Sequence, residues 1–222
     1  MSAKKYDVYA IGNAIVDYEI EVDNTFLEAN GVEKGLMTLA EQDRQDGLLR
    51  AAKSNIRKKQ AGGSAANSVV ALVQLGGTGF YSCKVASDVD GTFYRDDLVK
   101  QGVATNLSDA KLVEGVTGKC LVMITPDAER TMSTFLGISS NLSLSELNLD
   151  QLENSHYLFL EGYLVSSPSG FEAIKEAKKR AKMVGVKTAL TFSDPSMVKY
   201  FGDQMHEVVG EGVDLLFCNE EE

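Results

Sequence analysis

The chain has 222 residues, of which 22 are lysine or arginine and 32 are aspartate or glutamate, so its formal net charge at pH 7 is −10. This acidic balance argues against nucleic acid or an anionic membrane as a partner, because both would repel the chain. It does not exclude a small phosphate-bearing ligand, which a few local donors and a metal ion can hold. The length suits one large domain.

The three cysteines, Cys83, Cys120 and Cys218, are far apart and lie in apolar, strand-like segments. No Cys-x-x-Cys pair and no cysteine–histidine cluster is present, so the spacing indicates neither a disulfide framework nor a zinc site. We therefore expect buried, reduced thiols in a cytoplasmic protein.

The first part of the chain predicts a buried strand and then a half-exposed one. The apolar run Tyr6–Ile11 ends at Gly12-Asn13. Between residues 16 and 23, apolar side chains occupy the even positions and acidic ones the odd positions, which is typical of a strand with one buried face. A companion strand is predicted at 35–39, and the charged segment 41–59 is predicted to be helical.

The middle of the chain predicts a strand at 79–86, a helix at 93–101 and two strands, 118–125 and 130–136, joined by a hairpin turn. Two-sided strands of this kind do not suit the inside of a parallel sheet. We therefore expect a small antiparallel sheet beside the main domain, which could serve as a lid.

After Asn141, strands alternate with helices. The predicted order is strand 156–164, helix 168–184, strand 187–192, helix 195–209 and strand 213–218. This alternation indicates right-handed crossovers and a parallel sheet. Ligands bind at the carboxyl ends of such strands. Polar residues follow several of them: Gly12-Asn13, Ser87-Asp88, Ser193-Asp194 and Asn219. Of these, Asp194 is expected to be structural.

The run from Ala61 to Gly77 is the most informative motif. Gly62 and Gly63 have no side chains, so a ligand can lie directly on the backbone there. A helix follows, whose first N–H groups and Asn67 could bind a polar ligand. The alternative is a tight turn before an ordinary core helix. The full run resembles the first signature of the ribokinase-type (PfkB) carbohydrate and nucleoside kinases.

This resemblance extends over nearly the whole chain and is strongest for adenosine-kinase-like members. It implies a Rossmann-like (ribokinase-like) α/β fold with a mostly parallel sheet flanked by helices and a small antiparallel β lid, incomplete at the C-terminus. Residues 1–222 would form the N-terminal portion of one such domain, with lid segments at about 14–40 and 112–136.

The same resemblance implies a set of acceptor-binding residues. The aspartate at position 17 would accept hydrogen bonds from ribose hydroxyls, although a solvated residue of the lid strand is the alternative. The implied substrate-binding residues are Asn13, Asp17, Gly62, Gly63, Ser64 and Asn67.

Three residues are implied on the phosphate side, where ATP and Mg²⁺ would be the cofactors. Arg130 would reach the transferring phosphate, or would simply be an exposed hairpin charge. Asn219 and Glu222 match the spacing of the family's Asn-x-x-Glu motif, which organises the nucleotide phosphates and, indirectly, magnesium. A solvated acidic end is the alternative here.

The family's Gly-x-Gly-Asp motif, which supplies the general base, is not found in this sequence. We therefore expect the chain alone to be inactive and to associate, either as a homodimer or with a completing C-terminal chain. The parent protein is expected to phosphorylate the primary hydroxyl of a ribosyl nucleoside. The alternatives are another PfkB kinase (of ribose, fructose or a hexose phosphate), a non-catalytic sugar- or nucleoside-binding module, and an α/β fold of another enzyme.

Overall fold

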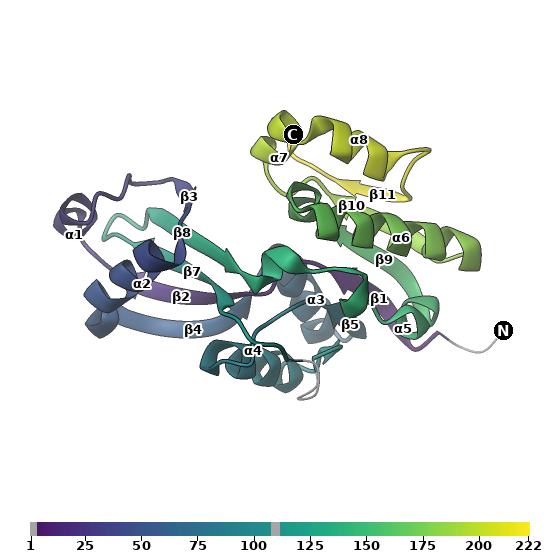
Figure 1. Cartoon of the computed structure of the whole chain (residues 1–222), viewed down its shortest axis with the longest axis horizontal. Coiled ribbons are helices and arrows are strands. Elements are labelled where there is room, and N and C mark those ends of the chain that lie inside the picture. The colour runs from purple at the N-terminus through teal and green to yellow at the C-terminus, as the bar shows by residue number, and fades with distance from the viewer. Residues whose placement is uncertain (1–3, 108–111) are drawn as a thin grey trace.

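The computed structural model describes residues 4–107 and 112–222, which form two sheets joined at one end (Figure 1). Sheet A is parallel throughout. Its strands, from edge to edge, are β11 (Leu215–Phe217), β10 (Lys187–Thr191), β9 (Ser155–Glu161), β1 (Tyr6–Ile11), β5 (Gly79–Ser82) and β6 (Ala104–Thr105). The predicted parallel α/β sheet is confirmed.

Sheet B extends away from sheet A and is mixed rather than antiparallel. Its strands are β3 (Met37–Leu39), β8 (Arg130–Gly137), β7 (Thr117–Ile124), β2 (Ile15–Glu21) and β4 (Ile56–Gly62). The pairs β7–β8 and β2–β4 are antiparallel, whereas β2–β7 and β3–β8 are parallel. The expectation of an antiparallel sheet was wrong in this respect, because β2 and β7 both begin at the join and run in the same direction.

The segment predicted to be helical over 41–59 divides in two. Helix α2 covers Gln42–Ala51, a 3₁₀ turn η1 covers Lys53–Asn55, and the rest belongs to β4. Pairing with the neighbouring strand β2 therefore overrides the helix-forming tendency of the lysine-rich stretch.

Helices cover both faces of sheet A. One face packs against α5 (Leu149–Glu153), α6 (Pro168–Val184) and α8 (Gly202–Val209), and the other against α3 (Ser64–Gln74) and α4 (Val89–Lys100). The remaining elements are α1 (Asn24–Ala29), α7 (Pro195–Tyr200) and the 3₁₀ turns η3 (Ile138–Asn141), η4 (Leu144–Glu146) and η5 (Gly162–Ser166). The segment 195–209, expected to be mostly helical, forms the two helices α7 and α8, which are separated at Phe201, where the backbone leaves helical geometry.

Local signals set the longest helix. Ser167 caps the start of α6, Pro168 occupies its first position, and Gly185 ends it in the left-handed conformation at φ 71°. Ile174, Ala177 and Ala181 along one face are fully buried. The predicted bounds 168–184 are confirmed.

The core has two parts, one on each face of sheet A. The part beneath α3 and α4 continues into sheet B, where Val16, Tyr18 and Ile20 of β2 are buried. The opposite face of sheet B carries Asp17 and stays available for a ligand.

Within residues 4–107 and 112–222, no helix is long and apolar enough to cross a membrane. Cys83 and Cys120 are buried free thiols, as predicted. Cys218 is also free but exposed, which corrects the expectation for this residue. It follows the edge strand β11, whose side chains are themselves exposed.

Candidate functional site

The predicted acceptor-binding residues meet where sheet B joins sheet A. Ile15 at the start of β2 lies opposite Gly62, the last residue of β4, and β4 leads through Gly63 into α3. Ser64 and the exposed Asn67 lie in the first turn of this helix. Segments that are some fifty positions apart in sequence thus form a corner at the join of the two sheets, near the middle of the molecule (Figure 1).

Asp17 and Gly62 are in direct contact at this corner. A Cβ at Gly62 would lie 2.2 Å from Asp17 Oδ2, so only glycine leaves room for the carboxylate. Burial raises the pKa of Asp17 to about 6, and the positive charge of Arg130 opposes this shift. Within the described residues the carboxylate has no hydrogen-bond or ion-pair partner. The Asp17 carboxylate is therefore a hydrogen-bond acceptor to which none of the described residues donates.

The turn at Gly63 is held by close packing and by two buried tyrosines. Gly63 has φ +105°, and a Cβ there would lie 2.2 Å from the Asn13 carbonyl oxygen. The Tyr81 hydroxyl donates to that same oxygen at 3.0 Å, and the Tyr94 hydroxyl donates to the Gly62 carbonyl at 2.8 Å. Sequence reasoning missed both tyrosines because each looks like an ordinary core aromatic residue.

Glu161, at the end of β9, is the main residue that sequence reasoning missed. Its side chain is 1% exposed. One oxygen accepts from the backbone N–H of Asn13 at 3.0 Å and from its side-chain amide at 3.2 Å, while the other accepts from the N–H of Ala65 at 2.8 Å. The helix N–H groups expected to be free for ligand are thus partly occupied. Asn13 is likewise turned towards Glu161.

The floor of the site is the ligand-side face of sheet B. Cys120 pairs with Asp17 in register, and Thr134 pairs with Cys120. Both are only 7% exposed, and the Thr134 hydroxyl donates to the Cys120 sulfur at 3.4 Å. Burial raises the pKa of both Asp17 and Cys120, and the charge of Arg130, which is exposed at the start of β8 and shares this face by strand alternation, opposes part of each rise.

A cavity of about 430 Å³ adjoins this floor. Asn13, Leu136 and Tyr163 line it together with the serine-rich residues 166–169, which run from the end of η5 into the first turn of α6. The volume is within the range of ~300–1,000 Å³ that is usual for small-molecule sites. The site therefore has room for a small molecule beside Asn13.

The sequence of this chain is similar to those of known kinases. The pfkB family carbohydrate kinase model matches residues 41–222. The chain belongs to the PfkB family. The guanosine-inosine kinase of Escherichia coli (strain K12) is 26% identical, over 97% of this chain and 51% of that protein.

Solved structures of similar fold extend the comparison. An adenosine kinase from Sinorhizobium meliloti has a TM-score of 0.88 and 36% identity, covering 98% of this chain and 66% of that one. A probable sugar kinase from Rhizobium etli CFN 42 has a TM-score of 0.88 and 29% identity, with coverage of 99% and 66%. The PfkB chain thus spans about half the length of the curated relative and about two thirds of the solved ones.

The acidic end of the PfkB chain forms a closed turn after β11. The Asn219 side-chain oxygen accepts from the N–H groups of Glu221 and Glu222 at 2.9 Å, and the Asn219 amide donates to Glu222 at 3.2 Å. The two predicted residues therefore lie together, and both are hydrogen-bonded to each other. Among residues 4–107 and 112–222 there is no group of three or more side chains suited to holding a metal ion.

Two other polar residues at strand ends have structural partners. Asp194 accepts from the N–H of Ser196 at 2.8 Å and so caps α7, as expected. Asp88 caps α4 and accepts from the N–H and hydroxyl of Thr117 at 2.8 and 2.6 Å, which ties β7 to α4.

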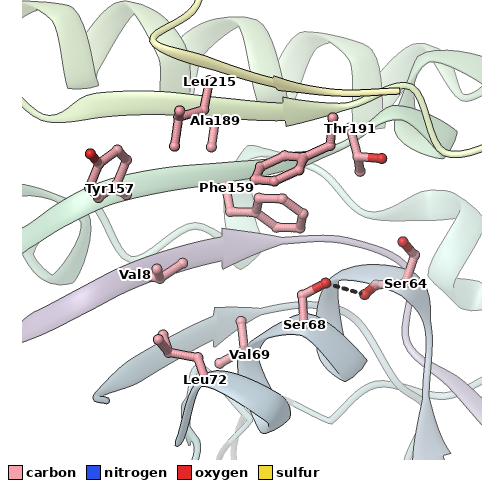
Figure 2. A pocket seen from close by; sticks show the side chains of 11 residues that line it. Val8, Ser64, Ser68, Val69, Leu72, Tyr157, Phe159, Ala189, Thr191 and Leu215 are labelled. Atoms are coloured by element: carbon pink, nitrogen blue, oxygen red, sulfur yellow. Dashed lines mark hydrogen bonds between the residues drawn. The ribbon is translucent and has the colours of Figure 1, made fainter. Parts of the chain in front are cut away.

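The PfkB chain also has an apolar hollow of about 460 Å³ on the α3 side of sheet A (Figure 2). Val8, Phe159 and Leu215 from the sheet face Val69 and Leu72 of α3 across it. No charged side chain lines the hollow. The hydroxyls of Ser64, Ser68 and Thr191 also line it.

Proposed function

We propose that the protein is an ATP-dependent nucleoside kinase of the adenosine-kinase-like type, and that this chain supplies mainly the acceptor-binding part. The phosphoryl acceptor is the primary hydroxyl of the ribosyl group. The observation that carries the proposal is the half-buried Asp17 carboxylate, which has no partner in the described residues and lies against the bare backbone of Gly62.

This arrangement suits a sugar with neighbouring hydroxyls. A carboxylate can accept from two hydroxyl donors at once. The glycines at 62 and 63 let the Asp17 carboxylate and the Asn13 carbonyl pack directly on the backbone, which holds Asp17 in place beside the ligand. The side chain of Asn67 and the hydroxyl of Ser64 add donors and acceptors at the start of α3. The ligand hydroxyls would replace the water that solvates Asp17.

The phosphate side of the proposal rests on fewer groups. Arg130 is a cation that shares a sheet face with Asp17, and it would stabilise charge on the transferring phosphate. Asn219 and Glu222 would hold the nucleotide phosphates and waters bound to Mg²⁺, which when bound neutralises phosphate charge. Glu222 would act through water, because Mg²⁺ keeps much of its hydration shell.

A nucleoside is favoured over a bare sugar by the cavity beside Asn13. Tyr163 offers an aromatic ring there, and Leu136 an apolar surface, which together suit a nucleobase. The relatives named as adenosine kinase and guanosine-inosine kinase support the same class. The similarity to a probable sugar kinase keeps another sugar as the second candidate.

Titration calorimetry with adenosine, guanosine, inosine, ribose and fructose tests the proposal on this chain. We expect a nucleoside to bind and Asp17→Asn to weaken its binding at least tenfold, which corresponds to ~1.4 kcal/mol. Glu19→Gln, two residues along the same face of β2, is the matched control and should bind as the unmodified chain does. Binding of a sugar but no nucleoside would favour the second candidate, and full affinity in Asp17→Asn would overturn the site.

A further inference from the structure

Glu161 joins two segments that are distant in sequence. Its Oε1 accepts from Asn13 in the turn between β1 and β2, 148 residues away, and its Oε2 accepts from Ala65 in the first turn of α3, 96 residues away. These are the segments that present the candidate acceptor-binding groups. One carboxylate therefore spans both.

The Glu161 carboxylate is closely packed against its neighbours. A Cβ at Gly12 would lie 2.5 Å from Glu161 Oε2 and 2.7 Å from the Ala65 Cβ. The first turn of α3 receives no side-chain cap from Gly63, so the glutamate supplies the negative group that a helix N-terminus favours. Glu161, at the end of strand β9, thus caps the N-terminus of helix α3.

Burial of this carboxylate is not balanced by an opposite charge. Within residues 4–107 and 112–222, its polar partners are the N–H groups of Asn13 and Ala65 alone. Burial raises the pKa of Glu161 to about 7, and these hydrogen bonds offset only part of the shift. An apolar residue would avoid this desolvation cost. This costly group lies between the two turns.

We propose that Glu161 is a positioning residue of the acceptor site, whose two oxygens fix the spacing between the Gly12-Asn13 turn and the Gly63–Ala65 turn. The proposal rests on the proposed function, because those turns are named there as the sugar-binding segments. It assigns Glu161 no contact with the substrate.

Glutamine is the informative replacement. It has nearly the same shape but only one acceptor oxygen, and its amide would point a donor at the donor of either Asn13 or Ala65. Glu161→Gln should therefore release one of the two turns. Glu146 provides a matched control, since it is a half-buried carboxylate that caps the 3₁₀ turn η4 by accepting from Ser143.

The ionisable groups that face Glu161 stay protonated near neutral pH. Burial is the main cause of a raised pKa for each of them: Tyr81 on β5, Cys83 after β5, Tyr94 on α4 and Tyr163 on η5. The nearby acidic group that titrates in the same region is Asp17 on β2, at about 6. A titration felt at both turns is therefore assigned to Glu161 when it is lost in Glu161→Gln and kept in Asp17→Asn.

The first test is an NMR titration of the unliganded 222-residue chain. The amide signals of Asn13 and Ala65 should shift together with one midpoint near pH 7. Glu161→Gln should remove this shared titration, while Glu146→Gln should retain it. Signals that titrate with separate midpoints, or not at all, would overturn the proposal without any ligand being needed.

The second test is the affinity for the nucleoside that the chain binds best. Kd should rise at least tenfold in Glu161→Gln and stay unchanged in Glu146→Gln. In the unmodified chain, Kd should also rise as the pH falls through the midpoint of the amides, a measurement that stands even if Glu161→Gln does not fold. Unchanged affinity in both measurements overturns the positioning role. Shared amide titration without any nucleoside binding would count against the proposed function instead.

Discussion

The carboxylate of Asp17 lies against the α-carbon of Gly62, so that a Cβ on the glycine would come within 2.2 Å of Oδ2. The acid belongs to the second strand of the chain and the glycine to a strand more than forty residues later, and their antiparallel pairing brings them together. The contact shows that the corner is formed before any ligand arrives. Its packing leaves space for a ligand only on the side away from Gly62.

Gly62→Ala should damage this corner in two ways. The new methyl group would push the Asp17 carboxylate aside, which we expect to lower the free energy of unfolding by ~1–3 kcal/mol and to abolish nucleoside binding. Urea denaturation and calorimetry measure the two effects. Gly47→Ala is the control, because its Cβ would be 4.0 Å from the nearest atom, on Arg50, inside helix α2. That change should stabilise the chain by ~0.5–1 kcal/mol. Equal effects of the two substitutions would contradict the packing described for Gly62.

Asp17→Asn should change how stability depends on pH. Because burial raises the pKa of Asp17 from its usual value of 3.8 to about 6, the folded state holds a proton that the unfolded state has already lost between these values. The Asp17 side chain therefore lowers stability progressively as the pH rises from 4 to 6, by up to ~3 kcal/mol.

Asparagine does not titrate, so the Asp17→Asn variant should gain stability relative to the unmodified chain as the pH rises over this interval. Urea denaturation at pH 4 and at pH 7.5 measures the difference. The same difference between variant and unmodified chain at both pH values would show that the carboxylate is not penalised by burial.

Asp90→Asn should loosen the attachment of sheet B to α4. Asp90 in the first turn of α4 accepts from the Tyr18 hydroxyl at 2.5 Å and from Lys59 at 2.6 Å, and it lies 3.3 Å from Lys119. Burial raises the pKa of Asp90, but these neighbours outweigh it and hold the pKa below its usual range. Neutralising the carboxylate removes the nearest negative charge from two largely buried ammonium groups, of which Lys119 keeps only Asp46 at 3.8 Å, and we expect this to cost ~3 kcal/mol.

Thermal unfolding of Asp90→Asn should be compared with that of Asp127→Asn. Asp127 pairs with Lys34 at 2.6 Å on the exposed tip of the β7–β8 hairpin. Removing this solvent-exposed charge should leave the midpoint nearly unchanged. A similar loss in both variants would mean that the Asp90 cluster contributes no more than a surface ion pair.

Phe217→Glu should reduce self-association. Leu215, Leu216 and Phe217 on the edge strand β11 are 45–51% exposed beside the apolar hollow of sheet A, so we expect the chain to associate as its concentration rises. Sedimentation velocity across a concentration series measures this. Met183→Glu, at a 67% exposed methionine on α6, controls for the added charge and should not alter association. A monomer at all concentrations would contradict the expectation.

Features marked by local signals could be predicted from the sequence. The bounds of α6 follow from Ser167, Pro168 and Gly185, which act within one turn of the chain. The strand character of residues 56–59 could not be predicted, because it depends on pairing with β2 about forty residues earlier. The mixed order of sheet B has the same origin, since relative strand direction is a property of the assembled sheet.

The candidate site divides in the same way. Asp17 and the two glycines stand in two separate stretches that resemble family motifs, and the structure brings Asp17 into contact with Gly62. Glu161 could not be predicted, because its partners Asn13 and Ala65 lie far away in sequence. A single acidic residue at the end of an apolar strand looks the same whether it faces water or two buried N–H groups.

The join between the two sheets also restricts how they can move. Strands β2, β4, β7 and β8 all enter or leave sheet B there, and a Cβ at Gly63 or Gly137 would come within 2.2 Å of a carbonyl oxygen on the neighbouring segment, that of Asn13 or Val116. Because the join is closely packed, we expect sheet B to move as one unit and not to bend at the join. We therefore expect a movement of the β7–β8 hairpin tip to shift the corner at Asp17 and Gly62. A fluorophore attached at this tip would then report whether a ligand occupies that corner.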